Sequence, residues 1–372
     1  MHFVKTNKTR YCGIDLHSKS MMLCIVNREG KILFRKRLAN NFALVHQHLL
    51  PYLPDLAVAV ESTFNWYWLV DACREHGIEI HLGHATYMKS VYGGKNKSDR
   101  LDCIQIANLL RSGMLPFAHA YPQQHRGIRD LLRRRLYYSQ TLSSFQAHGR
   151  VMYYQNGIID IESGTLKRKK GRSALIARLP DNGPRSSVRY DIETIEHLQD
   201  VLRRLERELV TYTRRAEPNR SVEILKSLPG VGDILGHTMY YETGDLLRFK
   251  KRQRFSSYTR LVRPQRESNG KFTGHGNARI GDPYLKWAFM EILNTAPKVS
   301  PVFKTLIEQL SARHGRLKAR AILAHKLCIA VYYMLKRQEP FDESRFEAMI
   351  KKDQHPLTNN SRSKEKEYMP SM

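Results

Sequence analysis

Residues 11–38 read YCGIDLHSKSMMLCIVNREGKILFRKRL, and this stretch predicts the fold of the first part of the chain. Three apolar runs of strand length cover residues 11–16, 21–27 and 31–38, and Arg28-Glu29-Gly30 separates the second from the third. Such runs, punctuated by polar and glycine residues, predict a β-meander. The first run contains a carboxylate, Asp15, which is expensive to bury without a partner. Taken alone, Asp15 is explained by a strand end that faces solvent.

The residues that follow predict strands alternating with helices. LAVAV at residues 56–60 is a continuous apolar run, as in a strand buried on both faces, and Glu61 ends it. A helix over 64–76 with Ser62 and Thr63 as possible caps, a strand over 78–82 and a helix over 99–111 come next. This order predicts a mixed sheet covered by helices, an α/β domain that we assign to residues 1–118.

The middle of the chain, residues 119–220, is predicted to form a helical arm. Residues 123–157 have a helical, basic pattern, and residues 161–190 are rich in Gly, Ser, Lys and Arg, which predicts a loop. Residues 191–215 carry apolar side chains at steps of three and four: Ile195, Leu198, Leu202, Leu205, Leu209 and Tyr212. That spacing predicts a coiled coil, and an ordinary bundle helix explains it equally well.

Residues 221–345 are predicted to form a mainly α-helical domain. Leu228-Pro229-Gly230-Val231-Gly232 predicts a tight turn into a helix, as in helix-hairpin-helix elements, whose backbone N–H groups can bind phosphate. Asp282 followed by Pro283 predicts a helix start, and residues 317–336 predict a last long helix. We expect residues 346–372, which are polar and rich in Lys and Ser, to be a disordered tail.

The charge of the chain points to a polyanionic partner. It has 372 residues, with 62 lysines and arginines against 35 aspartates and glutamates, a net charge of +27. Nucleic acid is the commonest partner of so basic a protein. A membrane partner is disfavoured, because no apolar run approaches the ~20 residues that span a bilayer. With no secretory signal and five cysteines without a CxxC pair, we expect a cytoplasmic protein with reduced thiols and no structural zinc.

Four carboxylates predict a metal site. Asp15 and Glu61 end two strands, while Asp99 and Asp102 share one helix face at positions i and i+3. If the first and fourth strands are neighbours, the strand-end carboxylates meet, and a helix packed over that end adds the aspartate pair. Ionised together they require a cation, and oxygen donors of this kind suit Mg²⁺. For the aspartate pair alone, the helix dipole is a sufficient explanation.

The same segments resemble a known family. Gly13-Ile14-Asp15-Leu16-His17, Val60-Glu61-Ser62-Thr63 and Lys97-Ser98-Asp99-Arg100-Leu101-Asp102 resemble the DEDD pattern of RuvC-like domains of the RNase H fold. With Leu-Pro-Gly-Val-Gly at 228–232 and Glu-Ser-Asn-Gly-Lys at 267–271, residues 10–340 resemble the DEDD-type insertion-sequence transposases. That group includes the pilin-gene invertase Piv and the bridge-RNA-guided recombinases.

The resemblance implies a mechanism and its participants. Ser268 attacks a DNA phosphate to form a phosphoserine link, assisted by Mg²⁺ (or Mn²⁺) at the DEDD residues. The resemblance also implies a structured guide RNA, a homo-oligomer (dimer or tetramer) formed through the arm, and a bacterial or archaeal, nucleoid-associated protein. Four basic residues near Ser268 in sequence could hold the phosphate: Arg263, Arg266, Lys271 and Arg279.

Three alternatives remain open at this stage. In Ser-Asn-Gly, Ser268 is also a common turn residue. The carboxylates also suit a Mg-dependent junction-resolving nuclease in which water attacks, and the basic surface also suits a non-catalytic nucleic-acid-binding protein. An actin-like ATPase is disfavoured, because no phosphate-binding glycine follows Asp15. The chain departs from the family at Arg260, near a position where a glycine is common, and at Asn277-Ala278-Arg279.

Overall fold

The computed structural model describes residues 2–91, 99–162, 164–181, 183–215, 219–262, 264–277 and 280–354, without the side chains of Asp99, Asp353 and Gln354. The chain divides into two compact units, Met1–Arg126 and Gly127–Met372. The finer division at residues 118, 220 and 345 stays a prediction.

A five-stranded mixed sheet forms the centre of the first unit. Its strand order is β3-β2-β1-β4-β5. The first three strands form the expected antiparallel meander, and β1 pairs in parallel with β4, which in turn pairs in parallel with β5. The first and fourth strands are therefore neighbours, as the carboxylate prediction requires. The strands are β1 (Arg10–Leu16), β2 (Ser20–Val26), β3 (Ile32–Ala39), β4 (Leu56–Glu61) and β5 (Glu79–Gly83).

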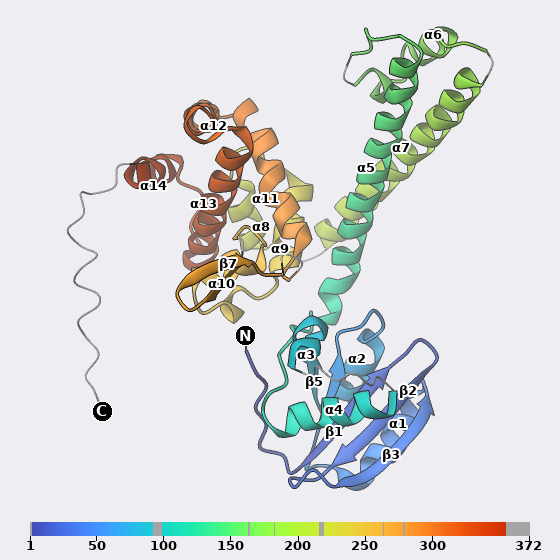
Figure 1. Ribbon diagram of the computed structural model, residues 1–372, viewed down its shortest axis with the longest axis vertical. Helices are drawn as coiled ribbons and strands as arrows, with labels where there is room; N and C mark the ends of the chain where they lie inside the picture. The colour runs from blue at the N-terminus through green and yellow to red at the C-terminus, as the bar shows by residue number, and fades with distance from the viewer. Residues whose placement is uncertain are drawn as a thin grey trace. The chain divides into compact units, whose positions relative to one another are not determined.

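Helices cover both faces of this sheet (Figure 1). Cys12, Ile14 and Leu16 of β1 pack in one cluster with α1 and α2, while Tyr11 of β1 packs in the cluster of α4 on the other face. Strand side chains alternate between faces, so the odd-numbered β1 residues face α4. The helices are α1 (Phe42–Leu49), η1 (Leu50–Tyr52), α2 (Tyr67–Glu75), α3 (Ala85–Val91) and α4 (Asp99–Arg111).

The start of α2 corrects one sequence expectation. The helix predicted over residues 64–76 begins at Tyr67, and Trp66 at its N-cap makes no side-chain cap hydrogen bond. Ser62 does not cap it; its Oγ accepts a hydrogen bond from the Ala85 N–H instead.

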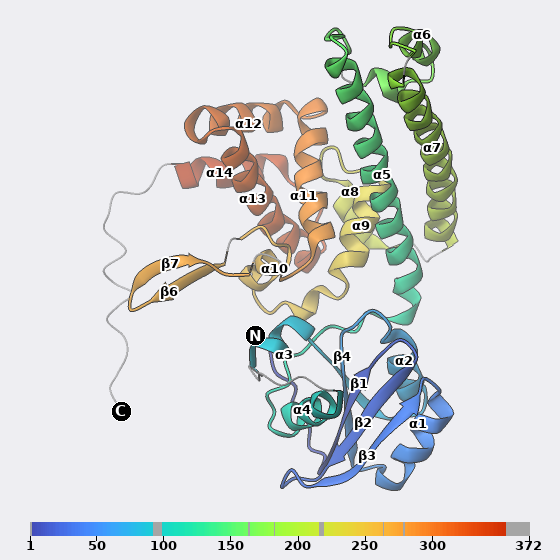
Figure 2. The ribbon, with the colours of Figure 1, turned by 45° about the vertical axis from the view of Figure 1, so that its right-hand side comes forward.

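Two long helices run side by side in the second unit, in both views of Figures 1 and 2. They are α5 (Gln123–Gln155) and α7 (Pro184–Arg215), with η2 (Thr165–Lys167) and α6 (Arg172–Ala177) between them. The loop expected over 161–190 is thus partly helical, and α7 begins seven residues before the predicted start. The apolar stripe of α7 is buried from Ile195 to Leu209, whereas Tyr212 is exposed.

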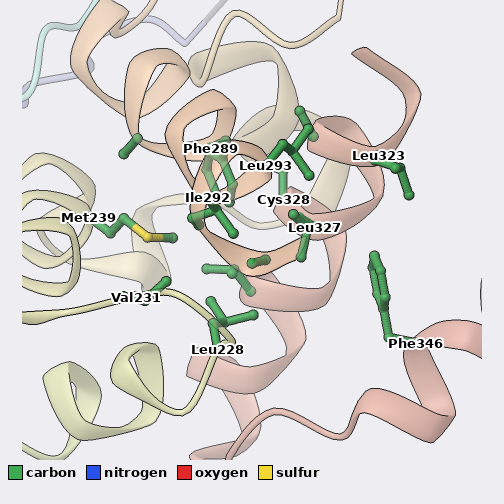
Figure 3. Packing of buried hydrophobic residues seen from close by; sticks show 14 of the residues in the cluster. Leu228, Val231, Met239, Phe289, Ile292, Leu293, Leu323, Leu327, Cys328 and Phe346 are labelled. Carbon is green, nitrogen blue, oxygen red and sulfur yellow. The ribbon is translucent and has the colours of Figure 1, made fainter. Parts of the chain in front are cut away.

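The remainder of the second unit is mostly helical and has one large core. Figure 3 shows Phe289 and Ile292 of α11 lying close to Leu327 and Cys328 of α13, and all four are fully buried. A two-stranded hairpin is inserted before α11. The elements are α8 (Arg220–Lys226), α9 (Asp233–Thr243), η3 (Leu246–Arg248), α10 (Arg252–Tyr258), β6 (Gln265–Ser268), β7 (Lys271–His275), α11 (Pro283–Thr295), η4 (Ala296–Lys298), α12 (Pro301–His314), α13 (Arg316–Arg337) and α14 (Glu343–Gln354).

The predicted tail begins too early. Residues 343–354 form α14, and its Phe346 and Ile350 are buried in the large core, 3% and 2% exposed. A helix that contributes two anchors to a core is not disordered, so the expectation for 346–354 is wrong. The rest of the tail, from residue 355, lies outside the described residues.

Two further sequence expectations concern helices and thiols. No helix in the described part of the chain is long and apolar enough to cross a membrane. All five cysteines are buried free thiols.

Candidate functional site

Asp15 and Glu61 occupy the ends of adjacent parallel strands. Ile14 of β1 pairs with Val60 of β4, so the next residues on the two strands, Asp15 and Glu61, are neighbours on the face opposite to Ile14. The Asp15 side chain is only 7% exposed, and its Oδ2 lies 3.1 Å from Nε2 of His17. His17 therefore contacts the carboxylate that the sequence places at the centre of the site.

Helix α4 packs on the same face, unusually close to β1. A Cβ atom at Gly13 would lie 2.2 Å from the Cys103 carbonyl oxygen and 2.4 Å from the Ala107 nitrogen. Only glycine permits this approach. Arg111, at the C-terminal end of α4, donates to the carbonyl of Arg28 beyond the far end of β2. The N-terminal end of α4 therefore lies toward Asp15.

Of the four predicted metal ligands, the structure shows Asp15 and Glu61 as neighbours at the ends of adjacent strands. The start of α4 carries Asp102, half-buried, toward the strand ends that carry Asp15 and Glu61. The fourth member, Asp99, has its side chain outside the described residues. Among the side chains that the structure does describe, no three His, Cys, Asp or Glu residues are close enough together to hold a metal ion. The predicted donors are carboxylate oxygens, a set that fits Mg²⁺ by chemistry.

Ser268 is the last residue of β6 and flanks a two-residue turn. It pairs with Lys271 across the hairpin, and Asn269 and Gly270 between them have φ angles of +50° and +71°. Two positive φ angles with the sequence Asn-Gly are typical of a type I′ turn. Every residue of β6 is exposed. The turn interpretation of the tripeptide is therefore confirmed, and it leaves the Ser268 hydroxyl accessible.

Two of the four predicted phosphate-binding residues share the face of Ser268. Lys271 lies directly opposite Ser268, and Arg266 lies two positions before it, paired with Gly274 beyond a bulge. Alternation along the strand puts the three side chains on one face of the hairpin. Arg263 and Arg279 lie outside the described residues.

The base of this hairpin is closed by one backbone hydrogen bond and one side-chain hydrogen bond. The Gly276 N–H donates to the carbonyl of Pro264 at 2.8 Å, and Arg260 Nε donates to the carbonyl of Gly281 at 2.9 Å. Arg260 has a φ of +57°, a conformation that glycine adopts more easily. Here an arginine occupies the position and gains a hydrogen bond.

The turn at residues 228–232 is confirmed as an entry into a helix. Gly232 is the N-cap of α9. Gly230 has a φ of +77°, and a Cβ there would lie 2.6 Å from the nitrogen of Ala296. The glycine at 230 is thus required by close packing against the end of α11. The helix-hairpin-helix resemblance of this turn stays a prediction.

Sequence analysis did not predict a cluster of charged residues near the hairpin, three of them buried and Arg133 partly buried: Arg129 and Arg133 of α5, Glu242 of α9 and Asp282, the N-cap of α11. Glu242 is 1% exposed and accepts hydrogen bonds from both arginines, at 2.8 Å from Arg129 Nε and 2.8 Å from Arg133 Nη2. Asp282 Oδ2 lies 3.6 Å from Arg133 Nη2 and 3.9 Å from Arg129 Nη2. We call these four residues the buried charge cluster.

Burial and the charge of Glu242 raise the pKa of Asp282 to about 7, although Arg133 acts in the opposite direction. The arginines lie nearer to Glu242 than to Asp282, so Asp282 gains less from them than it loses by burial. No local pattern in the sequence could have revealed the cluster, because Arg129 and Glu242 are 113 positions apart.

Two protein-family models match this chain. A model of the DEDD type of IS110, described as "Transposase", matches residues 12–151, which include Asp15, Glu61, Asp99 and Asp102. A second, described as "Transposase IS116/IS110/IS902 family", matches residues 222–308, which include the turn at 228–232 and Ser268.

Two relatives are similar over most of their length. The transposase for insertion sequence element IS1111A of Coxiella burnetii is 23% identical over 341 residues, 88% of this chain and 90% of the relative. The mini-circle transposase for IS117 of Streptomyces coelicolor is 24% identical over 408 residues, 91% of this chain and 96% of the relative.

Proposed function

The chain belongs to the IS110/IS116/IS902 family of insertion-sequence transposases, and from this premise we propose that it cuts and rejoins DNA through Ser268. The observation that carries the proposal is the exposed Ser268 beside the type I′ turn of the hairpin, with Arg266 and Lys271 on the same face. Two cations beside an accessible hydroxyl suit the approach of a phosphodiester.

The proposed reaction has two balanced steps. The Oγ of Ser268 forms a bond to a DNA phosphorus as the bond to one sugar oxygen breaks, and that oxygen leaves as a hydroxyl with the proton that the serine loses. A sugar hydroxyl of the partner strand then attacks the phosphoserine, which restores the serine and rejoins the DNA. A serine hydroxyl is a weak nucleophile unless it is activated.

The carboxylates of the first unit are proposed to assist through a metal. Asp15, Glu61 and Asp102, together with Asp99, would hold Mg²⁺, or Mn²⁺ in its place. When bound, the ion would neutralise negative charge that develops on the phosphate. The adjacency of Asp15 and Glu61 supports this, as does the close packing of α4 that Gly13 allows. The mixed sheet with its first and fourth strands paired supports an RNase H-like, RuvC-like fold.

Further partners follow from the family and the charge. A net charge of +27 supports binding of DNA, both element ends and target, and of a structured guide RNA. The helical pair α5 and α7 is proposed as the arm that assembles a dimer or tetramer, and the turn at 228–232 as a helix-hairpin-helix-like phosphate contact. We place the protein at the nucleoid of a bacterial or archaeal cytoplasm.

Strand exchange on a plasmid tests the proposal. The plasmid carries the gene with its natural flanks, and joined ends are detected by amplification across the new junction. Wild-type protein and Ser257→Ala, an exposed serine of α10, are expected to recombine equally. Ser268→Ala and Asp15→Asn are expected to lose the product by at least a hundredfold. Recombination by Ser268→Ala at the Ser257→Ala level would eliminate the serine mechanism.

A junction-resolving nuclease is the second candidate function. It would use the same four carboxylates, of which Asp15 and Glu61 are adjacent in the structure. It predicts that Ser268→Ala still cleaves branched DNA in Mg²⁺ whereas Asp15→Asn does not. Cleavage of this pattern, without exchange by the wild type, would favour it.

A further inference from the structure

The buried charge cluster contains more charge than stability of the fold requires. Arg129, Glu242 and Asp282 are 7%, 1% and 3% exposed, and Arg133 is partly buried with them. Burying ion pairs costs desolvation energy, and apolar residues of similar size often hold a fold together as well. Such a cluster therefore invites a functional explanation.

Asp282 connects the cluster to the hairpin that carries Ser268. Its backbone N–H donates to the Tyr258 carbonyl at 2.6 Å, and the Tyr258 hydroxyl lies 3.5 Å from Asp282 Oδ2. Tyr258 ends α10, and Asp282 precedes α11, so the two ends of the hairpin segment meet there. The next contact toward the hairpin is the hydrogen bond from Arg260 Nε to the Gly281 carbonyl.

Asp282 is also fixed to α11. Its Oδ1 accepts hydrogen bonds from the backbone N–H groups of Tyr284 and Leu285, at 2.8 and 2.9 Å. One carboxylate thus joins the start of α11, the end of α10 and the cations of α5. Displacing it would move the base of the hairpin.

From α5, Arg133 contacts Glu242, Asp282 and Tyr284. It donates through two nitrogens to Glu242, lies 3.6 Å from Asp282, and covers the ring of Tyr284 at 4.2 Å from the centroid. A planar guanidinium can make these contacts together, whereas an ammonium group cannot.

We propose that Arg133, through Glu242 and Asp282, positions the Ser268 hairpin relative to α5 and thereby sets the reach of the serine toward DNA. Arg133 is a positioning residue and touches neither substrate nor the reacting atoms. The proposal rests on the proposed function only for its catalytic readout. The structural half, a hairpin base held by α5, stands independently of the identity of the nucleophile.

The test compares Arg133→Met with Arg133→Lys and a matched control. Arg135→Met removes a cation of the same helix whose ion pair, at 2.8 Å, is with Glu206 of α7 and not with a member of the cluster. For each full-length protein we would measure the melting temperature, DNA affinity, the rate of covalent protein–DNA adduct formation, and hydrogen exchange of residues 265–282.

For Arg133→Met we expect at least a tenfold slower adduct, with DNA affinity within twofold of the wild type and faster exchange at Gly276 and Asp282. Arg133→Lys keeps the positive charge but lacks the planar guanidinium, and we expect it to slow adduct formation about threefold to tenfold. Arg135→Met is expected to match the wild type in adduct rate and in hairpin exchange.

An adduct rate for Arg133→Met within twofold of the wild type would overturn the proposal, as would equal slowing by Arg135→Met. If Arg133→Met does not fold, the Arg133→Lys protein decides by the same criteria. If the wild type forms no adduct at all, the proposed function fails. Hydrogen exchange then decides the positioning role alone: unchanged exchange of residues 265–282 in the Arg133 variants contradicts it.

Discussion

Asp282 is a carboxyl group whose pKa is raised by its place in the fold. It serves as the N-cap of α11, where a negative charge is favourable, but it is almost fully buried beside Glu242. Burial outweighs the helix N-terminus and the two arginines, so the pKa is raised to about 7. The residue is therefore poised to change its charge near neutral pH.

The Asp282 pKa predicts how stability changes with pH. The pKa of Asp282 in the folded protein lies above the unfolded value of about 3.9. Its contribution to the free energy of unfolding is therefore fully present below pH ~4 and is lost as the pH rises through ~7. Asp282→Asn keeps an N-cap side chain and removes the titration. Between pH 5 and 8 we expect the wild type to lose about 2 to 3 kcal/mol more unfolding free energy than this variant.

Denaturant unfolding of both proteins at several pH values measures this difference. Parallel profiles for wild type and Asp282→Asn would show that Asp282 ionises normally in the folded protein. Profiles that diverge in the other direction, with the wild type gaining stability as the pH rises, would show that the arginines outweigh burial.

Arg260 allows a second prediction at this scale. Its φ of +57° is strained for any residue with a Cβ, and its side chain offsets this by donating to the Gly281 carbonyl. Both Arg260→Gly and Arg260→Ala lose that hydrogen bond, but only glycine relieves the strain. We expect Arg260→Gly to be more stable than Arg260→Ala by about 1 kcal/mol.

Thermal unfolding of the two Arg260 variants checks the order. At ordinary positions alanine is the more stable residue, by roughly 0.5–1 kcal/mol, so the reversed order is diagnostic. Equal stabilities, or a more stable Arg260→Ala, would mean that the backbone at residue 260 is not left-handed in solution.

At the scale of elements, the packing of α4 on β1 places the carboxylates. Gly13 is the contact that allows it, because backbone atoms of α4 occupy the space where a side chain would begin. Local sequence patterns predict both β1 and α4. The parallel pairing of β1 with β4 then makes Asp15 and Glu61 neighbours. The pattern does not reveal how closely the helix approaches.

Gly13→Ala is expected to push α4 away from the strand. Overpacking of this kind costs typically 1–3 kcal/mol, and more where backbone must move. We expect a loss of about 3 kcal/mol and weaker Mn²⁺ binding, measured by denaturant unfolding and by calorimetry. Gly127→Ala is the control, because a Cβ added to this glycine of α5 would meet open space. The change should stabilise the folded protein by roughly 0.5–1 kcal/mol. Unchanged Mn²⁺ affinity in Gly13→Ala would show that the position of α4 does not matter for metal binding.

The elements that sequence failed to predict share a physical cause. α6 is only six residues long, and α14 is held to the core by Phe346 and Ile350, with Met349 packed beside them. Such helices are stabilised by tertiary burial and leave a weak periodic signal. By contrast, the apolar run of β4 predicted that strand to within one residue of its observed ends, and the periodic stripe of α7 predicted the end of that helix at Arg215 although not its start.

At the scale of the whole molecule, the two units differ in how much of their candidate sites the sequence predicts. The strand-end carboxylates could be grouped because chain order and parallel pairing bring Asp15 and Glu61 together. The buried charge cluster could not be predicted, because it joins α5, α9 and α11 across more than a hundred residues. Family resemblance supplied Ser268, whose own local sequence indicates only a turn.

The proposed chemistry makes one residue of the second unit the point of attachment to DNA. The fold supports this with an exposed hairpin, which Figure 2 shows standing away from the helices of its unit. Ser268 and the exposed Ser257 of α10 lie in the same unit, so a chemical map of the attachment site can distinguish them.

Mass spectrometry of a trapped protein–DNA adduct tests the central claim most directly. Wild-type protein is incubated with element-end DNA and Mg²⁺, denatured, and digested with nuclease and protease. We expect a nucleotide-bearing peptide whose modified residue is Ser268, absent from Ser268→Ala and retained in Ser257→Ala. Cleaved DNA with no modified peptide, or a nucleotide attached to any other residue, would contradict it.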